Sequence, residues 1–204
     1  MARFLVLGIG NLLWADEGFG VRAVEEFQRR YAVPPEVLAM DGGTQGLGLL
    51  PYVQEAEHLI ILDAVDFGLE PGTLVEKRDA EVPAVLGSMA MSLHQVSFQD
   101  VLALCQLTGR EPARLCLIGV QPVVLEDYGG SLSPLVKSRL EPAVEQVVAY
   151  LREHGVTCAE RTDQAAMEGC AGLRLEAYEQ LRPSAETACR VGDARFLNLR
   201  GEGA

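Results

Sequence analysis

Unbroken apolar runs alternate with amphipathic segments along the first 155 residues of the chain. The apolar runs predict strands near residues 3–8, 36–41, 58–63 and 115–121, and the first of these runs reads as a strand buried on both faces. The segments between them, near residues 20–31, 46–54, 93–109 and 132–154, have the apolar spacing of helices. This alternation predicts an α/β fold with three layers, in which a mostly parallel, twisted sheet is covered by helices on both faces.

The remaining segments predict less regular structure. Residues 73–78 read as a shorter strand at an edge of the sheet, and residues 79–92 read as irregular. The α/β architecture is complete by about residue 155, so we expect residues 1–155 to form one domain. Residues 156–204 contain only short apolar patches. We therefore expect them to form a partly ordered C-terminal extension and not a separate domain.

Composition narrows the class of protein. The formal net charge is −12, which argues against a nucleic-acid partner because a phosphate backbone favours a basic face. No apolar run approaches the roughly 20 residues of a membrane span, and Arg3 leads directly into a strand where a signal peptide would lie. The five cysteines form no C-x-x-C pair. An odd set of thiols indicates a reducing compartment, so we expect a cytoplasmic protein.

The stretch Arg3–Val21 combines a buried strand, a glycine turn and an acidic helix start. Its Gly8-x-Gly10 resembles a dinucleotide-binding fingerprint, but Leu13 stands where the third glycine is needed. Asp16 and Glu17 would also repel a pyrophosphate at that helix start. Asp16 is best explained as a helix N-cap. For Glu17, helix-dipole stabilisation and cation binding remain equally open.

Three side chains with metal-binding chemistry follow strands at the same predicted edge of the sheet. Glu17 lies beyond the first strand, Asp63 ends the central strand, and His94 begins a later helix. Two carboxylates and one imidazole leave open positions on a divalent ion but do not select the metal. The alternative is that His94 is an ordinary residue at a helix start. The sequence offers no evident nucleophile, since Cys105 and Cys116 fall inside a predicted helix and strand.

Four motifs, in order, resemble the nickel-iron hydrogenase maturation endopeptidases. They are Gly8-Ile-Gly10-Asn11 with Asp16-Glu17-Gly18, Asp41-Gly42-Gly43-Thr44, His58 to Ala64, and Ser92-Leu93-His94-Gln95. The resemblance covers about residues 3–155 and leaves the extension outside. It implies that Glu17, Asp63 and His94 contact a metal ion and act in catalysis, and that the turn of Asp41, Gly42 and Gly43 takes part in substrate recognition.

The resemblance also implies an activity and a partner. The protein would be an endopeptidase that removes the C-terminal extension of the hydrogenase large-subunit precursor, with nickel supplied by the loaded precursor. Two alternatives remain open on the sequence. One is a non-catalytic nickel checkpoint or escort protein that uses the same ligands, and the other is a nucleotide-binding α/β module.

Overall fold

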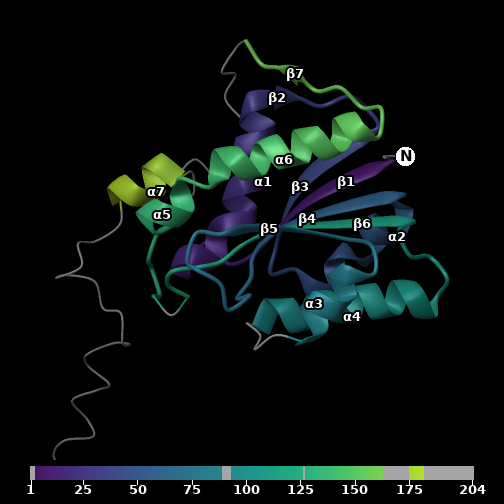
Figure 1. Cartoon of the computed structure of the whole chain (residues 1–204), viewed down its shortest axis with the longest axis horizontal. Helices are drawn as coiled ribbons and strands as arrows, with labels where there is room; N and C mark the ends of the chain where they lie inside the picture. The colour runs from purple at the N-terminus through teal and green to yellow at the C-terminus, as the bar shows by residue number, and fades with distance from the viewer. Residues whose placement is uncertain (1–2, 89–92, 126, 163–174, 182–204) are drawn as a thin grey trace, which may run out of the picture.

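A computed structural model describes residues 3–88, 93–125, 127–162 and 175–181 of the chain. Its central element is a five-stranded sheet with the order β3-β1-β4-β6-β5 (Figure 1). The strands are β1 (Phe4–Ile9), β3 (Val37–Gly43), β4 (His58–Ala64), β5 (Leu74–Arg78) and β6 (Arg114–Val120). Neighbouring pairs among β3, β1, β4 and β6 are parallel, and only β5 runs antiparallel, beside β6.

Helices cover both faces of this sheet (Figure 1). One face carries α1 (Phe19–Arg30) and α6 (Leu140–Glu153), and the other carries α2 (Leu50–Glu55), α3 (Glu81–Ser88) and α4 (Leu93–Leu107). Successive side chains of β1 and β4 face opposite helix layers. Phe4 and Ile60 pack with α1 and α6, while Leu5 and Ile61 pack with α2 and α4. This division explains the continuous apolar runs, because both side-chain directions of each strand are buried.

Short elements complete the described chain. They are the 3-10 turns η1 (Ala15–Gly18) and η2 (Gly46–Leu49), the short helices α5 (Pro134–Lys137) and α7 (Leu175–Leu181), and the paired strands β2 (Tyr31–Ala32) and β7 (Ala159–Glu160). None of the helices in these described ranges is long and apolar enough to cross a membrane.

The predicted fold class and the four parallel strands are confirmed, and β5 is the expected edge strand. Two element predictions are wrong. Residues 81–88 of the segment expected to be irregular form α3, because Val82 and Leu86, one helical turn apart, are both buried in the core; residues 89–92 lie outside the described residues. The single helix expected over residues 132–154 is divided into α5 and α6. Pro142 sits in the first turn of α6, where its missing N–H costs no helical hydrogen bond.

The extension contacts the domain through α7. Glu179 accepts hydrogen bonds from Ser131 Oγ at 3.0 Å and from Lys137 Nζ at 2.7 Å, and Leu175 packs against the core beneath α1 and α6. Arg22 lies 5.8 Å from the ring centre of Tyr178. Helix α7 is therefore fastened beside α5 by polar and apolar contacts together, while β7 holds the start of the extension through its pairing with β2.

Candidate functional site at the carboxyl edge of the sheet

Glycines bring the start of α1 against the sheet. A Cβ atom on Gly20 would lie 2.1 Å from the carbonyl oxygen of Leu62, and one on Gly8 would lie 2.3 Å from that of Gly20. No other residue type fits such close backbone approaches. Because α1 packs this tightly on β1 and β4, the preceding turn η1 lies against the carboxyl end of β4. In open α/β sheets this edge is the usual place of a binding site.

Asp16 is fully buried and fixes the shape of this edge. Its carboxylate accepts hydrogen bonds from the backbone N–H groups of Val123 and Val124 at 2.9 Å, and from the N–H and hydroxyl of Ser133 at 2.6 and 3.0 Å. The N-cap prediction is therefore wrong, since neither η1 nor α1 has a side-chain cap. Asp16 instead joins η1 to the loop that follows β6.

Glu17 and Asp63 belong to two elements, η1 and β4, that contact each other. Glu17 lies half-buried in η1, whose fold is held by the N–H of Asn11 donating to the Glu17 carbonyl at 3.1 Å. Gly10 adopts a φ of +139°, and a Cβ atom there would lie 1.8 Å from the same carbonyl oxygen. Asp63 is 1% exposed on β4, the strand that η1 contacts. The fold thus places two carboxylates at one edge of the sheet.

His94 belongs to the first turn of α4, and its side chain lies outside the described residues. The convergence of Glu17, Asp63 and His94 on one metal therefore stays a prediction. Among the side chains that are described, no group of three or more His, Cys, Asp or Glu residues could hold a metal ion. The two carboxylates are hard oxygen donors of the kind that bind divalent ions, and a complete site there needs further ligands.

The Asp41-Gly42-Gly43 turn lies beside the glycine turn of β1. The register of the β1–β3 pair shifts here, so that Gly8 pairs with Asp41 and Ile9 pairs with Gly43. Gly43 has a φ of +44°, which favours glycine. Asp41 is exposed, yet partial desolvation raises the pKa of its carboxyl against the opposing effects of the Gly43 N–H and Arg22. Its role in substrate recognition remains a prediction.

Sequence reasoning missed Gln121, which ties two loops of this edge together. Its side-chain oxygen accepts the N–H groups of Phe67 at 2.7 Å and Leu69 at 3.1 Å, and its nitrogen donates to Asp66 at 3.0 Å. The signal available in the sequence was a polar residue directly after the buried run of β6. With Asp16 and Gln121 in place, the connections after β1, β4 and β6 form one cross-linked surface.

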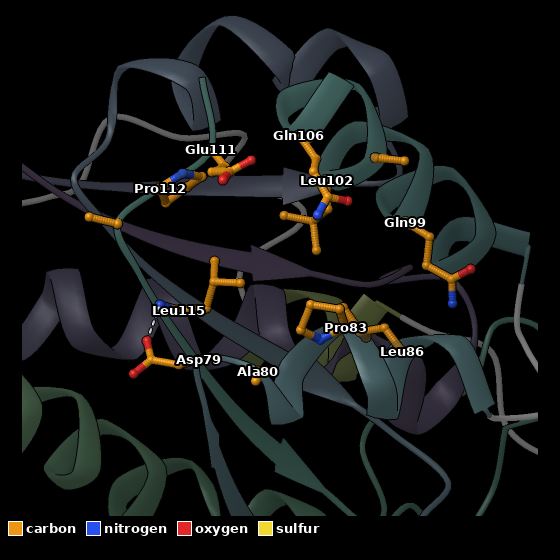
Figure 2. Close-up of a pocket in the computed structure, with 12 residues that line it drawn as sticks. Asp79, Ala80, Pro83, Leu86, Gln99, Leu102, Gln106, Glu111, Pro112 and Leu115 are labelled. Atoms are coloured by element: carbon orange, nitrogen blue, oxygen red, sulfur yellow. Dashed lines mark hydrogen bonds between the residues drawn. The ribbon is translucent and has the colours of Figure 1, made fainter. Parts of the chain in front are cut away.

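A separate cavity of about 450 Å³ opens between α3, α4 and the start of β6 (Figure 2). It is lined mainly by apolar groups such as Pro83, Leu86 and Leu102, and Asp79 closes one side by accepting the N–H of Leu115 at 3.1 Å. None of Glu17, Asp41 and Asp63 lines it. This cavity is therefore distinct from the candidate site.

The two buried cysteines do not supply a nucleophile. Cys105 and Cys116 are fully buried, and desolvation raises the pKa of both thiols, that of Cys116 to about 12. A thiol held protonated in this way is a poor nucleophile. Neither of these two thiols is therefore a candidate nucleophile.

Comparison with known proteins places this architecture in a defined group. The family described as hydrogenase maturation protease (HycI) matches residues 21–150. The hydrogenase expression/formation protein HupD of Rhodobacter capsulatus is 54% identical over 195 residues, which cover 96% of this chain and 93% of HupD. The hydrogenase 2 maturation protease of Escherichia coli K12 is 47% identical over 78% of this chain and 96% of its own.

A solved structure agrees with these sequence relatives. The hydrogenase maturating endopeptidase HybD from E. coli has a TM-score of 0.75 and 46% identity, over 79% of this chain and 99% of that chain. The HupD alignment reaches into most of residues 156–204, because it leaves only a few residues of this chain unmatched. The extension that the sequence analysis left outside the resemblance is thus shared with HupD.

Proposed function

Because the chain belongs to the hydrogenase maturation protease family, we propose that it removes the C-terminal extension of a nickel-loaded hydrogenase large-subunit precursor. The family gives a protease role in hydrogenase maturation, and HybD of E. coli is described as a hydrogenase maturating endopeptidase. The precursor as substrate, the C-terminal cut and the use of nickel are our proposal. The free thiols of Cys105, Cys116 and Cys158 fit a reaction in the reducing cytoplasm.

The pair of carboxylates at the carboxyl edge of β1 and β4 carries this proposal. Glu17 and Asp63 offer oxygen donors to the nickel that arrives with the precursor, and His94 would add an imidazole from α4. By binding that nickel, these side chains would hold the nearby peptide of the precursor against the edge. Bound nickel supplies polarisation of a carbonyl or activation of a water.

The chain's own contribution is to orient the substrate. Glu17 is held by a turn whose glycines and whose Asp16 anchor leave little freedom, and Asp63 is buried at the end of a central strand. Such restraint removes the entropy cost of aligning the reacting groups when the substrate binds. Two carboxylates and one imidazole lack the thiolates or several imidazoles of tight zinc sites, so the isolated protein should bind nickel weakly.

A cleavage assay with purified precursor tests the proposal. We expect nickel-loaded precursor to be shortened, as read by mass spectrometry, and nickel-free precursor to remain intact. Asp63→Asn should lower cleavage by at least about 100-fold, because loss of a charged ligand costs several kcal/mol and each 1.36 kcal/mol is about tenfold in rate. Glu55→Gln, an exposed carboxylate at the end of α2, serves as the matched control and should cut normally.

The same experiment separates the alternatives. A nickel checkpoint or escort protein would bind the loaded precursor and leave it uncut. Rapid cutting of nickel-free precursor, or stoichiometric nickel in the protein purified alone, would contradict the use of substrate nickel. A nucleotide-binding module is disfavoured because two carboxylates, Asp16 and Glu17, lie in η1 just before α1, where their charge would repel a pyrophosphate.

A further inference from the structure

Five large apolar side chains lie exposed beside η1. They are Leu13, Trp14, Val123, Val124 and Tyr128, between 36% and 50% exposed, and we call them the apolar rim. The two loops that carry them are joined, since the N–H of Gly129 donates to the Leu13 carbonyl at 2.7 Å. The rings of Trp14 and Tyr128 meet edge to face, with centres 5.5 Å apart. The rim is therefore one continuous surface built from residues more than a hundred positions apart.

The rim is held in place before any partner arrives. The buried Asp16 binds the N–H groups of Val123 and Val124, and the Asp16 N–H donates in turn to the Val124 carbonyl at 3.2 Å. Exposed apolar side chains on a fixed backbone mark an interaction surface, because binding there costs little ordering entropy. Trp14 directly precedes η1, so the rim adjoins Glu17.

The charge around the rim indicates what it binds. The described connections at this edge, residues 10–18, 44–45, 65–73, 121–125 and 127–133, contain no lysine or arginine, and their charged side chains outside the core are Glu17, Asp66, Glu70 and Asp127. Hydrogen bonds from Gln121 and Gly68 lower the pKa of Asp66, which keeps that carboxylate ionised. The opposite edge of the sheet carries both positive and negative charges, since Arg3 pairs with Glu57 and Arg114 pairs with Asp79.

We propose that the apolar rim and its acidic surroundings form the docking surface for a positively charged polypeptide segment of the substrate precursor. Lysine or arginine side chains there would stack on Trp14 and Tyr128 while their charge faces the surrounding carboxylates. A second copy of this chain is the wrong occupant, because a symmetric contact would bring two acidic edges together. Nucleic acid is excluded on the same ground. This inference rests on the proposed function and extends it to recognition of the precursor by a surface away from the metal.

The test measures binding and cleavage of nickel-loaded large-subunit precursor by four variants of the full chain. Trp14→Ala removes the aromatic anchor, and Val123→Ser removes an exposed side chain whose backbone contact with Asp16 is kept. Glu70→Lys reverses an exposed charge at the acidic edge, while Glu111→Lys makes the same change at the opposite edge, just before β6. Circular dichroism confirms that each variant is folded.

We expect Trp14→Ala to raise the dissociation constant and KM about tenfold, and Val123→Ser to raise them about threefold, with kcat changed by less than about twofold. Glu70→Lys should slow association about threefold and flatten its dependence on salt, and Glu111→Lys should do neither. The docking surface is contradicted if the wild-type protein cuts the precursor and Trp14→Ala and Val123→Ser bind it normally. It is contradicted equally if the two charge reversals have the same effect on association. If the wild-type protein neither binds nor cuts the precursor, the proposed function fails as well.

Discussion

Two neighbouring carboxylates show how burial assigns different tasks to similar side chains. Asp16 is fully buried and accepts four hydrogen bonds, so its charge is used to hold a loop. Glu17, one position later, is half-buried at the same edge as Asp63. The sequence could not separate the two, because an acidic pair before a helix suits both dipole stabilisation and ligand binding. The hydrogen-bond donors to Asp16 come from the loop after β6, and only the folded structure shows that they use this carboxylate and not that of Glu17.

His58 sits in a ring cluster at the other end of β4. It stacks on Phe4 with ring centres 4.4 Å apart, and its Nδ1 lies 3.1 Å from the hydroxyl of Tyr150. Burial, and next the proximity of His154, lower the pKa of His58. The folded protein therefore takes up this proton at lower pH than the unfolded chain, whose histidines titrate near pH ~6.5. The contribution of neutral His58 to the free energy of unfolding is fully present above the pKa of histidine in the unfolded chain. It is lost as the pH falls below that pKa towards the lower pKa of His58 in the folded protein.

We accordingly expect the free energy of unfolding, measured by urea titration, to fall between about pH 7.5 and about pH 5.5. The fall should be smaller in His58→Phe, which keeps an aromatic ring against Phe4 and cannot take up a proton. Loss of the Tyr150 hydrogen bond in this variant lowers stability equally at both pH values. Parallel pH profiles for the two proteins would show that His58 does not cause the dependence.

At the scale of elements, α1 is placed by glycines and not by side-chain packing alone. Gly20→Ala would put a methyl group 2.1 Å from the Leu62 carbonyl and 2.2 Å from the Ile9 carbonyl, so α1 must move away from the sheet. We expect a loss of about 3 kcal/mol in the free energy of unfolding, at the upper end for overpacking. Cleavage should fall as well in the protein that remains folded, because η1 and Glu17 move with α1.

Gly48→Ala is the matched control for this change. A Cβ atom there meets nothing closer than 3.8 Å, so stability and cleavage should stay close to those of the wild type. Denaturant unfolding and the precursor assay, run on both variants, measure the two effects. A fully stable and active Gly20→Ala protein would mean that the contact between α1 and β4 is not tight in solution.

The elements that the sequence predicted well are those with strong periodic signals. The runs of β1, β4 and β6 are apolar at nearly every position, because each of these strands has helices on both sides. The division between α5 and α6 was missed because the apolar pattern continues across it, although Pro142 argued against a single helix. The candidate site was predicted as residues at one edge, and its loop network was not. Hydrogen bonds such as Ser133 to Asp16 join positions 117 residues apart, which no local pattern reports.

At the scale of the whole molecule, residues 156–204 add few described side chains to the core, namely Val156, Cys158 and Leu175. The E. coli hydrogenase 2 maturation protease aligns with 78% of this chain, close to the length of the α/β domain. We therefore expect a chain ending at residue 162 to fold cooperatively. It should lose about 1–2 kcal/mol of stability, since the ion pair of Lys137 with Glu179 is partly exposed and Leu175 is only partly buried.

Thermal unfolding of the truncated and full-length chains measures this difference. Lys137→Ala in the full-length chain removes the ion pair alone, and should account for less than about 1 kcal/mol of it. A truncated chain that fails to fold would show that the extension is an integral part of the domain. Equal stability of the two chains would show that α7 adds no binding energy in solution.

The anchoring of Asp16 also orders events during synthesis of the protein. A nascent chain that has emerged only as far as β4 already contains Glu17 and Asp63, but not the donors at positions 123, 124 and 133. Asp16 is then a solvated carboxylate, and the turn that presents Glu17 lacks its anchor to the loop after β6. Contacts of such long sequence separation form only against the entropy cost of closing a long loop. A chain that ends before residue 123 therefore carries both carboxylates without the anchored turn that presents Glu17.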